Sequence, residues 1–233
     1  TGTKINISLI SDYLTKLIHL PISFFDTKQT GDILQRINDH SRIQGFLTDS
    51  SINAAFSIIN IIIFGSIICI YNRIVSLIFF LGSILYIFWV WAFMKQRAIL
   101  DNKIFTQNSA NQSSIIQLVT GMQEIKLNVC GQRKRWEWEH IQHNIYRLSM
   151  KSLKLSQFQQ SGGLFLNQAK NLIITAFVAT LVIKGKITLG MMISTQYIVG
   201  TLNSPVDQLI NFIRQFQDAQ LSLDRLQDVY EKP

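Results

Sequence analysis

Polar side chains inside or beside long apolar runs carry most of the chemical information in this sequence. They are amides, one hydroxyl and one cation: Asn53, Asn60, Asn167, Lys170, Asn171, Thr175, Gln196 and Asn203. A polar group without a partner costs free energy in an apolar environment, so each should face another helix or a hydrated cavity. Two roles fit these residues, hydrogen bonds that hold helices together or the lining of a transport pathway. Lys170 is the sharpest case, because a buried cation must reach water or line a cavity.

Three other motifs suggest chemistry but have simpler structural explanations. Glu137-x-x-His140 resembles half of a di-iron motif, which needs a second copy that the sequence lacks, so we expect no metal site. Ser161-Gly162-Gly163 resembles a nucleotide signature, yet at the mouth of an apolar run small residues favour close helix packing. The basic and aromatic run Arg133–Trp136 could bind nucleic acid, but beside a bilayer such a run is more typical of contacts with lipid headgroups or with a partner protein.

Catalytic motifs are missing from the sequence. It has no Gly-x-x-x-x-Gly-Lys-[Ser/Thr] phosphate loop and no set of nucleophile, base and acid. We therefore expect no catalytic residue, no metal and no cofactor bound by this chain itself, and no nucleic-acid partner.

The composition is that of a membrane protein. Of 233 residues, 48% are hydrophobic and only 15% are charged, against about 25% charged in an ordinary globular domain. Residues 51–72 and 74–94 contain no charge, residues 155–183 contain Lys170 alone, and residues 187–206 contain none. About 20 apolar residues cross a bilayer, so each run is long enough to span. We expect four spans, with Pro205 bending the last one and forming a gating joint with Gly200.

A polar segment separates the two pairs of apolar runs. Residues 95–154 hold ten Lys or Arg against four acids and contain no Pro. Residues 96–119 and 132–155 read as two long helices, and residues 120–131 read as the tip of the hairpin between them. Because both ends enter apolar runs, the hairpin is where a membrane protein would meet a cytoplasmic partner.

Charge asymmetry predicts the orientation. Of the 22 Lys and Arg, 19 lie outside the two short turns at 72–73 and 184–186. Cytoplasmic loops carry the excess of Lys and Arg, so both turns should lie outside and both ends of the chain in the cytoplasm. The opening segment reads as an amphipathic helix that Pro21 ends or bends, and it lacks the apolar core of a signal peptide. We expect the chain to be a piece cut from a longer protein.

The sequence therefore predicts one all-α membrane domain over residues 1–233. Its parts are the end of a second span and a first cytoplasmic loop (1–50), a membrane hairpin (51–94), a second cytoplasmic loop (95–154), another membrane hairpin (155–206) and a linker (207–233).

Several segments resemble ATP-binding cassette (ABC) exporters. Phe24-Phe25-Asp26 with Thr30-Gly31-Asp32 resembles their first cytoplasmic loop, which holds a short coupling helix. Gly121–Lys126 resembles the second coupling region, which docks on the nucleotide-binding domain of the opposite subunit, and Leu223–Leu226 resembles the segment leading into that domain. Order and spacing match over essentially the whole chain, which is identified as a type-one ABC exporter transmembrane domain with long cytoplasmic helical extensions.

The resemblance implies a function and its residues. Two such domains would enclose a cavity and alternate between inward-open and outward-open forms, driven by ATP and Mg²⁺ in a nucleotide-binding domain that this chain lacks. The implied contacts with that domain are Phe24, Phe25, Asp26, Gly31, Asp32, Gly121, Glu124 and Lys126. Residues 124–128, 190–192 and 200–205 look most like bacterial peptide and bacteriocin exporters, which often carry an N-terminal cysteine peptidase.

Partners and location follow from the same resemblance. We expect a nucleotide-binding domain on the same polypeptide, a second copy as a homodimer, a peptide substrate and a bacterial cytoplasmic membrane. Lipid or drug export within the same family remains open. A membrane signalling protein is disfavoured by the very short outer turns, an intramembrane enzyme by the lack of paired acids, and an inserting toxin by the lack of a solubilising face on residues 51–94.

Overall fold

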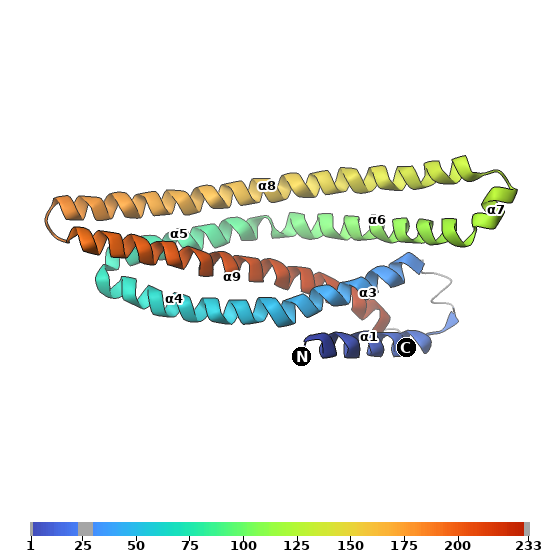
Figure 1. The fold of residues 1–233 in the computed structure, drawn as a ribbon, viewed down its shortest axis with the longest axis horizontal. Helices are drawn as coiled ribbons and strands as arrows, with labels where there is room; N and C mark the ends of the chain where they lie inside the picture. Colours follow the sequence, from blue (N-terminus) through green and yellow to red (C-terminus); the bar gives the residue numbers. More distant parts are fainter. Residues whose placement is uncertain (1, 23–29, 231–233) are drawn as a thin grey trace. The chain divides into compact units, whose positions relative to one another are not determined.

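The computed structural model describes residues 2–22 and 30–230, and these residues form helices and connecting turns with no β-strand. Figure 1 shows the helices in chain order, α1 (Gly2–Ile18), α3 (Thr30–Gly45), α4 (Ser51–Tyr71), α5 (Arg73–Ala92), α6 (Met94–Thr120), α7 (Met122–Leu127), α8 (Gly131–Ile183) and α9 (Leu189–Tyr230). A π-helical turn, Phe46–Ser50, joins α3 to α4. The all-α prediction is confirmed.

The chain divides into two compact units, which we call the polar unit and the apolar unit. The polar unit comprises Thr1–Leu47, Lys95–Leu155 and Gln217–Pro233, and the apolar unit comprises Thr48–Met94 and Ser156–Phe216. Helices α8 and α9 contribute residues to both. The apolar unit extends ten residues beyond Val206, the last residue of the predicted fourth span.

In the polar unit, the opening helix is amphipathic and buries one stripe. Tyr13 is fully buried, and it forms a small core with Leu20, Ile43 of α3 and Leu226 of α9. The helical hairpin expected over residues 95–154 is present, since α6 ends at Thr120, the short α7 forms the tip, and α8 begins at Gly131.

In the apolar unit, a short turn joins α4 to α5. The Asn72 side chain caps α5, because its oxygen accepts hydrogen bonds from the backbone N–H groups of Ile74 (2.9 Å) and Val75 (3.3 Å). The core is aliphatic with one aromatic ring and is formed by Ile68, Val75, Phe79, Val90, Ile174, Val178, Val199, Leu202, Val206 and Ile210.

The outer faces of α4 and α5 are also apolar. Large side chains such as Phe56, Ile59, Ile70 and Leu81 are more than half exposed on this chain, which fits lipid rather than water as their surroundings. By length and composition, three described helices could cross a membrane, within Thr30–Tyr71, Arg73–Thr120 and Gly131–Ile183. The fourth predicted span is helical from Leu189 but is not among them, so that span stays a prediction.

Candidate functional site

The tip of the hairpin presents the second group of expected coupling residues. Gly121 lies in the break between α6 and α7, and its N–H donates to the Gln117 carbonyl at 2.9 Å. Glu124 and Lys126 lie on α7 and are exposed. The left-handed residue that reverses the chain before α8 is not a glycine but Val129, with φ of 51°.

Apolar side chains accompany these charges at the tip. Met122 is 44% exposed, Leu127 75% and Val129 88%. Three large apolar groups beside a carboxylate and an ammonium form a surface suited to a protein partner. This set, Met122, Glu124, Lys126, Leu127 and Val129, is the hairpin tip surface.

The first group of coupling residues is only partly described. Phe24, Phe25 and Asp26 lie outside the described residues. Asp32 pairs with Arg36 at 3.4 Å on α3. Gly31, one of the expected coupling residues, lies inside α3 and is buried there, and its N–H donates to the Ser113 hydroxyl of α6 at 3.0 Å. A Cβ at position 31 would collide with the Ser109 carbonyl and with Ser113. Gly31 is therefore a close-packing residue between α3 and α6.

A cluster of charges that sequence reasoning missed joins α9 to α3 and α6. Arg225, with 11% of its side chain exposed, pairs with Asp101 at 2.8 Å and with Asp39 at 3.3 Å. It also donates to Asn102 at 2.7 Å and lies 4.2 Å from the centroid of the Phe105 ring. We call Arg225 with Asp39, Asp101 and Asn102 the Arg225 clasp.

Two neighbouring contacts extend the clasp. The Arg36 guanidinium donates to the Arg225 carbonyl, and Arg42 pairs with Asp101 at 3.3 Å. About two helical turns before Arg225 on α9, Asp218 pairs with Arg97 at 2.9 Å. Burial raises the pKa of Asp218, and the charge of Arg97 partly opposes that rise. In the sequence, this cluster was indicated only by the alternation of acids and bases along residues 207–233.

His40 lies beside the clasp. It is 2% exposed, its ring meets the edge of Tyr13 at 5.3 Å between centroids, and neither ring nitrogen has a hydrogen-bond partner among the described residues. Burial lowers the pKa of His40, while the adjacent Asp39 opposes the shift. The ring is therefore held in the neutral form at neutral pH.

In the apolar unit, the structure brings Lys170 and Asn203 together. The Lys170 side chain is buried, its ammonium donates to the Asn203 amide oxygen at 3.1 Å, and it lies 4.2 Å from the centroid of the Phe79 ring. Its methylene groups fill the space beside Gly82. Lys170 also lines a cavity of about 270 Å³ between α5 and α8 whose other lining side chains are apolar.

The other intramembrane polar residues are distributed over several faces. Asn167 and Asn171 lie four residues apart on α8, and each has a buried amide oxygen without a partner among the described residues. The Thr175 hydroxyl donates to the Asn171 carbonyl at 2.9 Å. Asn53 and Asn60 are exposed on α4.

Gly200, Pro205 and Gln196 lie on α9. Gln196 is partly buried there, and the helix continues through Pro205 without interruption. Among the described residues, no side chain and no backbone of another helix lies within 4 Å of a Cβ added at Gly200.

Sequence reasoning also missed polar contacts that use common residue types. The fully buried Ser57 of α4 donates to Gln208 of α9 at 2.5 Å, and Ser50 donates to Gln215. Serine and glutamine are too frequent in such segments for the sequence alone to single them out.

The small residues at 161–163 do permit close packing. A Cβ at Gly162 would overlap the Trp89 ring, and one at Gly163 would overlap the Tyr86 ring. The Trp89 indole donates to the Gln159 carbonyl at 3.1 Å. Trp89 thus packs against α8, whereas Trp91 is 62% exposed.

The Glu137-x-x-His140 motif forms surface ion pairs. Glu137 pairs with Lys134 at 2.7 Å and with Arg133 at 3.3 Å. Its hydrogen bond with Lys134, together with the nearby positive charges, lowers the pKa of Glu137. Among residues 2–22 and 30–230, no group of three or more His, Cys, Asp or Glu could hold a metal ion.

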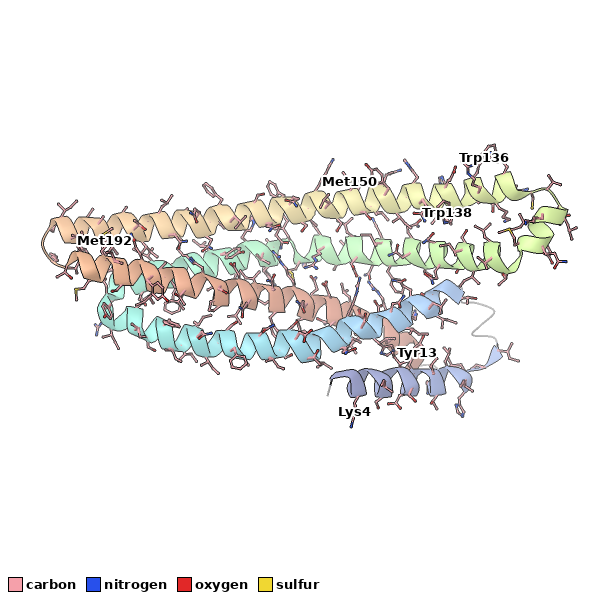
Figure 2. All side chains as sticks on the ribbon, in the orientation of Figure 1. Lys4, Tyr13, Trp136, Trp138, Met150 and Met192 are labelled. Atoms are coloured by element: carbon pink, nitrogen blue, oxygen red, sulfur yellow. The ribbon has the colours of Figure 1, made fainter. Side chains whose placement is uncertain are left out.

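Figure 2 shows all described side chains, with Trp138 on the side of α8 that faces α6 and Trp136 on the opposite side. The Trp138 indole donates to Asn111 of α6 at 3.0 Å, and Gln142 donates to the same oxygen at 2.7 Å. These contacts fasten the two arms of the hairpin to each other.

Comparisons with known proteins agree with this arrangement. The family described as "ABC transporter transmembrane region" matches residues 1–206. The chain is 28% identical over 233 residues to the mesentericin-Y105 transport/processing ATP-binding protein MesD of Leuconostoc mesenteroides, covering 98% of this chain and 32% of that protein. It is 26% identical over 237 residues to the alpha-hemolysin translocation ATP-binding protein HlyB of Escherichia coli O157:H7, covering 100% of this chain and 33% of that protein.

The fold has a close counterpart among solved structures. A bacterial Atm1-family ABC exporter with ATP bound superimposes with a TM-score of 0.92 at 14% identity, covering 99% of this chain and 41% of the other. The chain spans about a third of the length of the curated relatives it matches.

Proposed function

The chain belongs to the family of ABC transporter transmembrane regions, and from that premise we propose that it forms the translocation pathway of an ATP-driven exporter. In this proposal, nucleotide-binding domains bind and hydrolyse ATP with Mg²⁺, and their movement is passed to the apolar unit. Two copies of the chain enclose the pathway as a homodimer. The helices then alternate between inward-open and outward-open forms.

The observation that carries the proposal is the hairpin tip surface. Five side chains on and beside the six-residue helix α7 combine exposed apolar groups with one acid and one base. Exposed apolar side chains gathered at one place on a surface are typical of an interaction site, and a partner domain docked on the tip would bury them. Asp32, near the start of α3, together with Phe24, Phe25 and Asp26, would complete the contact with that partner, and Gly31 would support it by holding α3 against α6.

The contacts within the polar unit suit the transmission of force. Close packing at Gly31, the fastened hairpin arms and the Arg225 clasp tie α3, α6, α8 and α9 to their neighbours. A partner that pushes on α7 would therefore displace the polar unit as a body rather than bend one helix. The polar residues of the apolar unit, with Lys170 and Asn203 at their centre, would line the pathway, and Gly200 and Pro205 would give α9 its bend.

Peptide is the cargo that we propose. Support comes from the two relatives, whose names refer to mesentericin transport and processing and to alpha-hemolysin translocation. Lipids and small amphiphilic drugs are the alternatives, because the amides of the apolar unit suit them as well. The excess of Lys and Arg on the polar segments supports an orientation with both ends of the chain inside, and the bacterial sources of the two relatives support a bacterial cytoplasmic membrane.

The test is ATP hydrolysis by the full-length protein in lipid vesicles, with and without candidate peptides. Leu127→Asp places a charge in the hairpin tip surface, and we expect it to abolish stimulation by peptide. The matched control is Tyr146→Asp, which puts the same charge at an α8 position that is 63% exposed and away from the tip.

The outcomes separate the parts of the proposal. Loss of stimulation in Leu127→Asp but not in Tyr146→Asp supports coupling through the tip. A normal response of Leu127→Asp would remove α7 from the transmission. If no peptide stimulates hydrolysis while lipids or amphiphiles do, the exporter remains and the cargo changes.

A further inference from the structure

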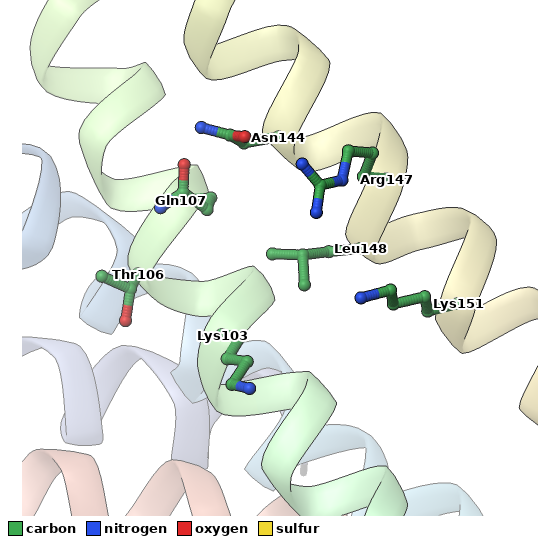
Figure 3. A pocket seen from close by; sticks show the side chains of 7 residues that line it. All are labelled: Lys103, Thr106, Gln107, Asn144, Arg147, Leu148 and Lys151. Atoms are coloured by element: carbon green, nitrogen blue, oxygen red, sulfur yellow. The ribbon is translucent and has the colours of Figure 1, made fainter.

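A second cavity lies in the polar unit, between α6 and α8. It has a volume of about 330 Å³, and three cations line it, Lys103 from α6 with Arg147 and Lys151 from α8. Figure 3 shows the three side chains directed toward the space between the two helices rather than away from it. A face that only kept the protein soluble would spread its cations outward.

The charge in this cavity is not compensated. The sequence has no acid from residue 102 to 123 and none from residue 140 to 183. Accordingly, none of the three cations forms an ion pair with a residue that the structure describes. By contrast, Arg133 and Arg135, nearer the tip on the same helix, each pair with a glutamate. Three like charges around one cavity repel each other, and a bound anion would relieve that repulsion.

Neutral hydrogen-bond donors complete the lining. They are the Gln107 amide on α6 and the Asn144 amide on α8. Thr106 also lines the cavity, but its hydroxyl donates to the Asn102 carbonyl at 3.1 Å. A guanidinium fork, two ammonium groups and neutral donors match the oxygens of a phosphate group, which takes several hydrogen bonds along with its charge. We propose that this basic cavity binds a phosphate group, the chemistry that an anionic phospholipid headgroup shares with soluble phosphates.

The position along α8 favours the lipid as the source. Lys151 lies four residues before Leu155, where the apolar run begins, a rise of about 6 Å along the helix, and Arg147 lies eight residues before it, a rise of about 12 Å that its long side chain must partly bridge. The headgroup layer on each side of the hydrocarbon is about 5–7 Å thick. Long basic side chains near this depth reach headgroup phosphates readily. The lipid source rests on the proposed function, because it requires this end of α8 to enter a bilayer.

The experiment removes the three cations of the basic cavity and compares the effect with that of removing three cations elsewhere on the protein. The test variant carries Lys103→Gln, Arg147→Gln and Lys151→Gln, and the control carries Arg133→Gln, Lys134→Gln and Arg135→Gln. Both lose the same net charge, but the control residues lie outside the cavity. The single variant Arg147→Gln is included in case the triple variant does not fold, as judged by its thermal transition.

Binding is measured on the full-length protein in neutral detergent. Native mass spectrometry counts bound phosphatidylglycerol and phosphatidylcholine, and calorimetry measures inorganic pyrophosphate. We expect a preference for phosphatidylglycerol that falls at least about tenfold in the test variant and several-fold in Arg147→Gln but stays within about twofold in the control. Binding of pyrophosphate without lipid preference, lost in the same variants, would support the site with a soluble phosphate instead.

Two results would overturn the proposal. One is wild-type binding of lipid and pyrophosphate by the test variant, and the other is an equal loss in the test and control variants. Because neither readout uses ATP hydrolysis or transport, the failure of this site and the failure of the proposed exporter function are distinguishable.

Discussion

Gly31 shows how one residue can fix the distance between two helices. Its missing side chain lets the backbone of α3 touch that of α6, and its N–H is satisfied by the Ser113 hydroxyl. Gly45, at the other end of the same helix, has no side chain or foreign backbone within 4 Å of an added Cβ. The two glycines of α3 are therefore a natural pair for separating contact from backbone freedom.

Gly31→Ala should destabilise the polar unit. The added methyl group would force α3 away from Ser109 and Ser113, at a cost of about 1–3 kcal/mol in the free energy of unfolding. Gly45→Ala should be neutral or stabilise by about 0.5–1 kcal/mol, because alanine loses less backbone entropy in a helix. Thermal unfolding of the full-length protein checks both. Equal midpoints for the two variants would show that the close contact at Gly31 does not matter.

At the scale of helices, α9 is the element whose role depends most on contacts distant in sequence. Arg225 reaches Asp39, a partner 186 residues away, and Asp101, a partner 124 residues away. Asp39 has only 2% of its side chain exposed, so its charge depends on this partner and on Arg42. Removal of one member of a buried pair costs more than the pair contributes, because the other charge is left in a dry environment.

Arg225→Ala should loosen the end of α9. We expect a loss of about 3 kcal/mol in the free energy of unfolding and faster amide hydrogen exchange over residues 217–226. Arg133→Ala serves as the control, since its pair with Glu137 lies on the surface, where ion pairs contribute little. If residues 217–226 exchange at the wild-type rate in Arg225→Ala, the clasp does not hold α9.

The positions of helices could be predicted where a local sequence pattern indicates them. The side-chain partners that are distant in sequence could not be predicted. The uncharged run 51–72 coincides with α4, because length and polarity act locally. The hairpin tip was visible for the same reason. The end of the polar run at Lys154 is not a helix end, since α8 continues through it to Ile183. The Arg225 clasp was not visible, since each of its ion pairs joins segments more than a hundred residues apart.

The predicted site residues show the same difference between local patterns and contacts distant in sequence. Lys170 stood out because a charge in an apolar run is rare, yet its partner Asn203 lay among several equivalent amides. The packing of Gly31 could not be predicted, because the sequence shows a glycine near the first coupling segment but not the α6 backbone that lies against it.

At the scale of the whole molecule, the question is whether the buried cation of the apolar unit stabilises the fold or serves transport. Within the described part of the chain, the Lys170 ammonium donates one hydrogen bond, to Asn203, and contacts the Phe79 ring, and the side chain lines a cavity that is otherwise apolar. A methionine of similar volume would fill that space without the desolvation cost of a charge. Stability alone therefore gives little reason for a lysine at this position, whereas a pathway that handles polar cargo does.

Lys170→Met should keep the thermal midpoint of the full-length protein at or above the wild-type value. Its cargo-stimulated ATP hydrolysis in vesicles should fall at least about fivefold, the lower end of ordinary coupling between sites. Ile62→Met, at an apolar α4 position that is 61% exposed and lies outside the set of polar residues, should change neither quantity. A lower midpoint with wild-type stimulation in Lys170→Met would mean that the Lys170–Asn203 bond holds α8 to α9 and that the cargo passes elsewhere.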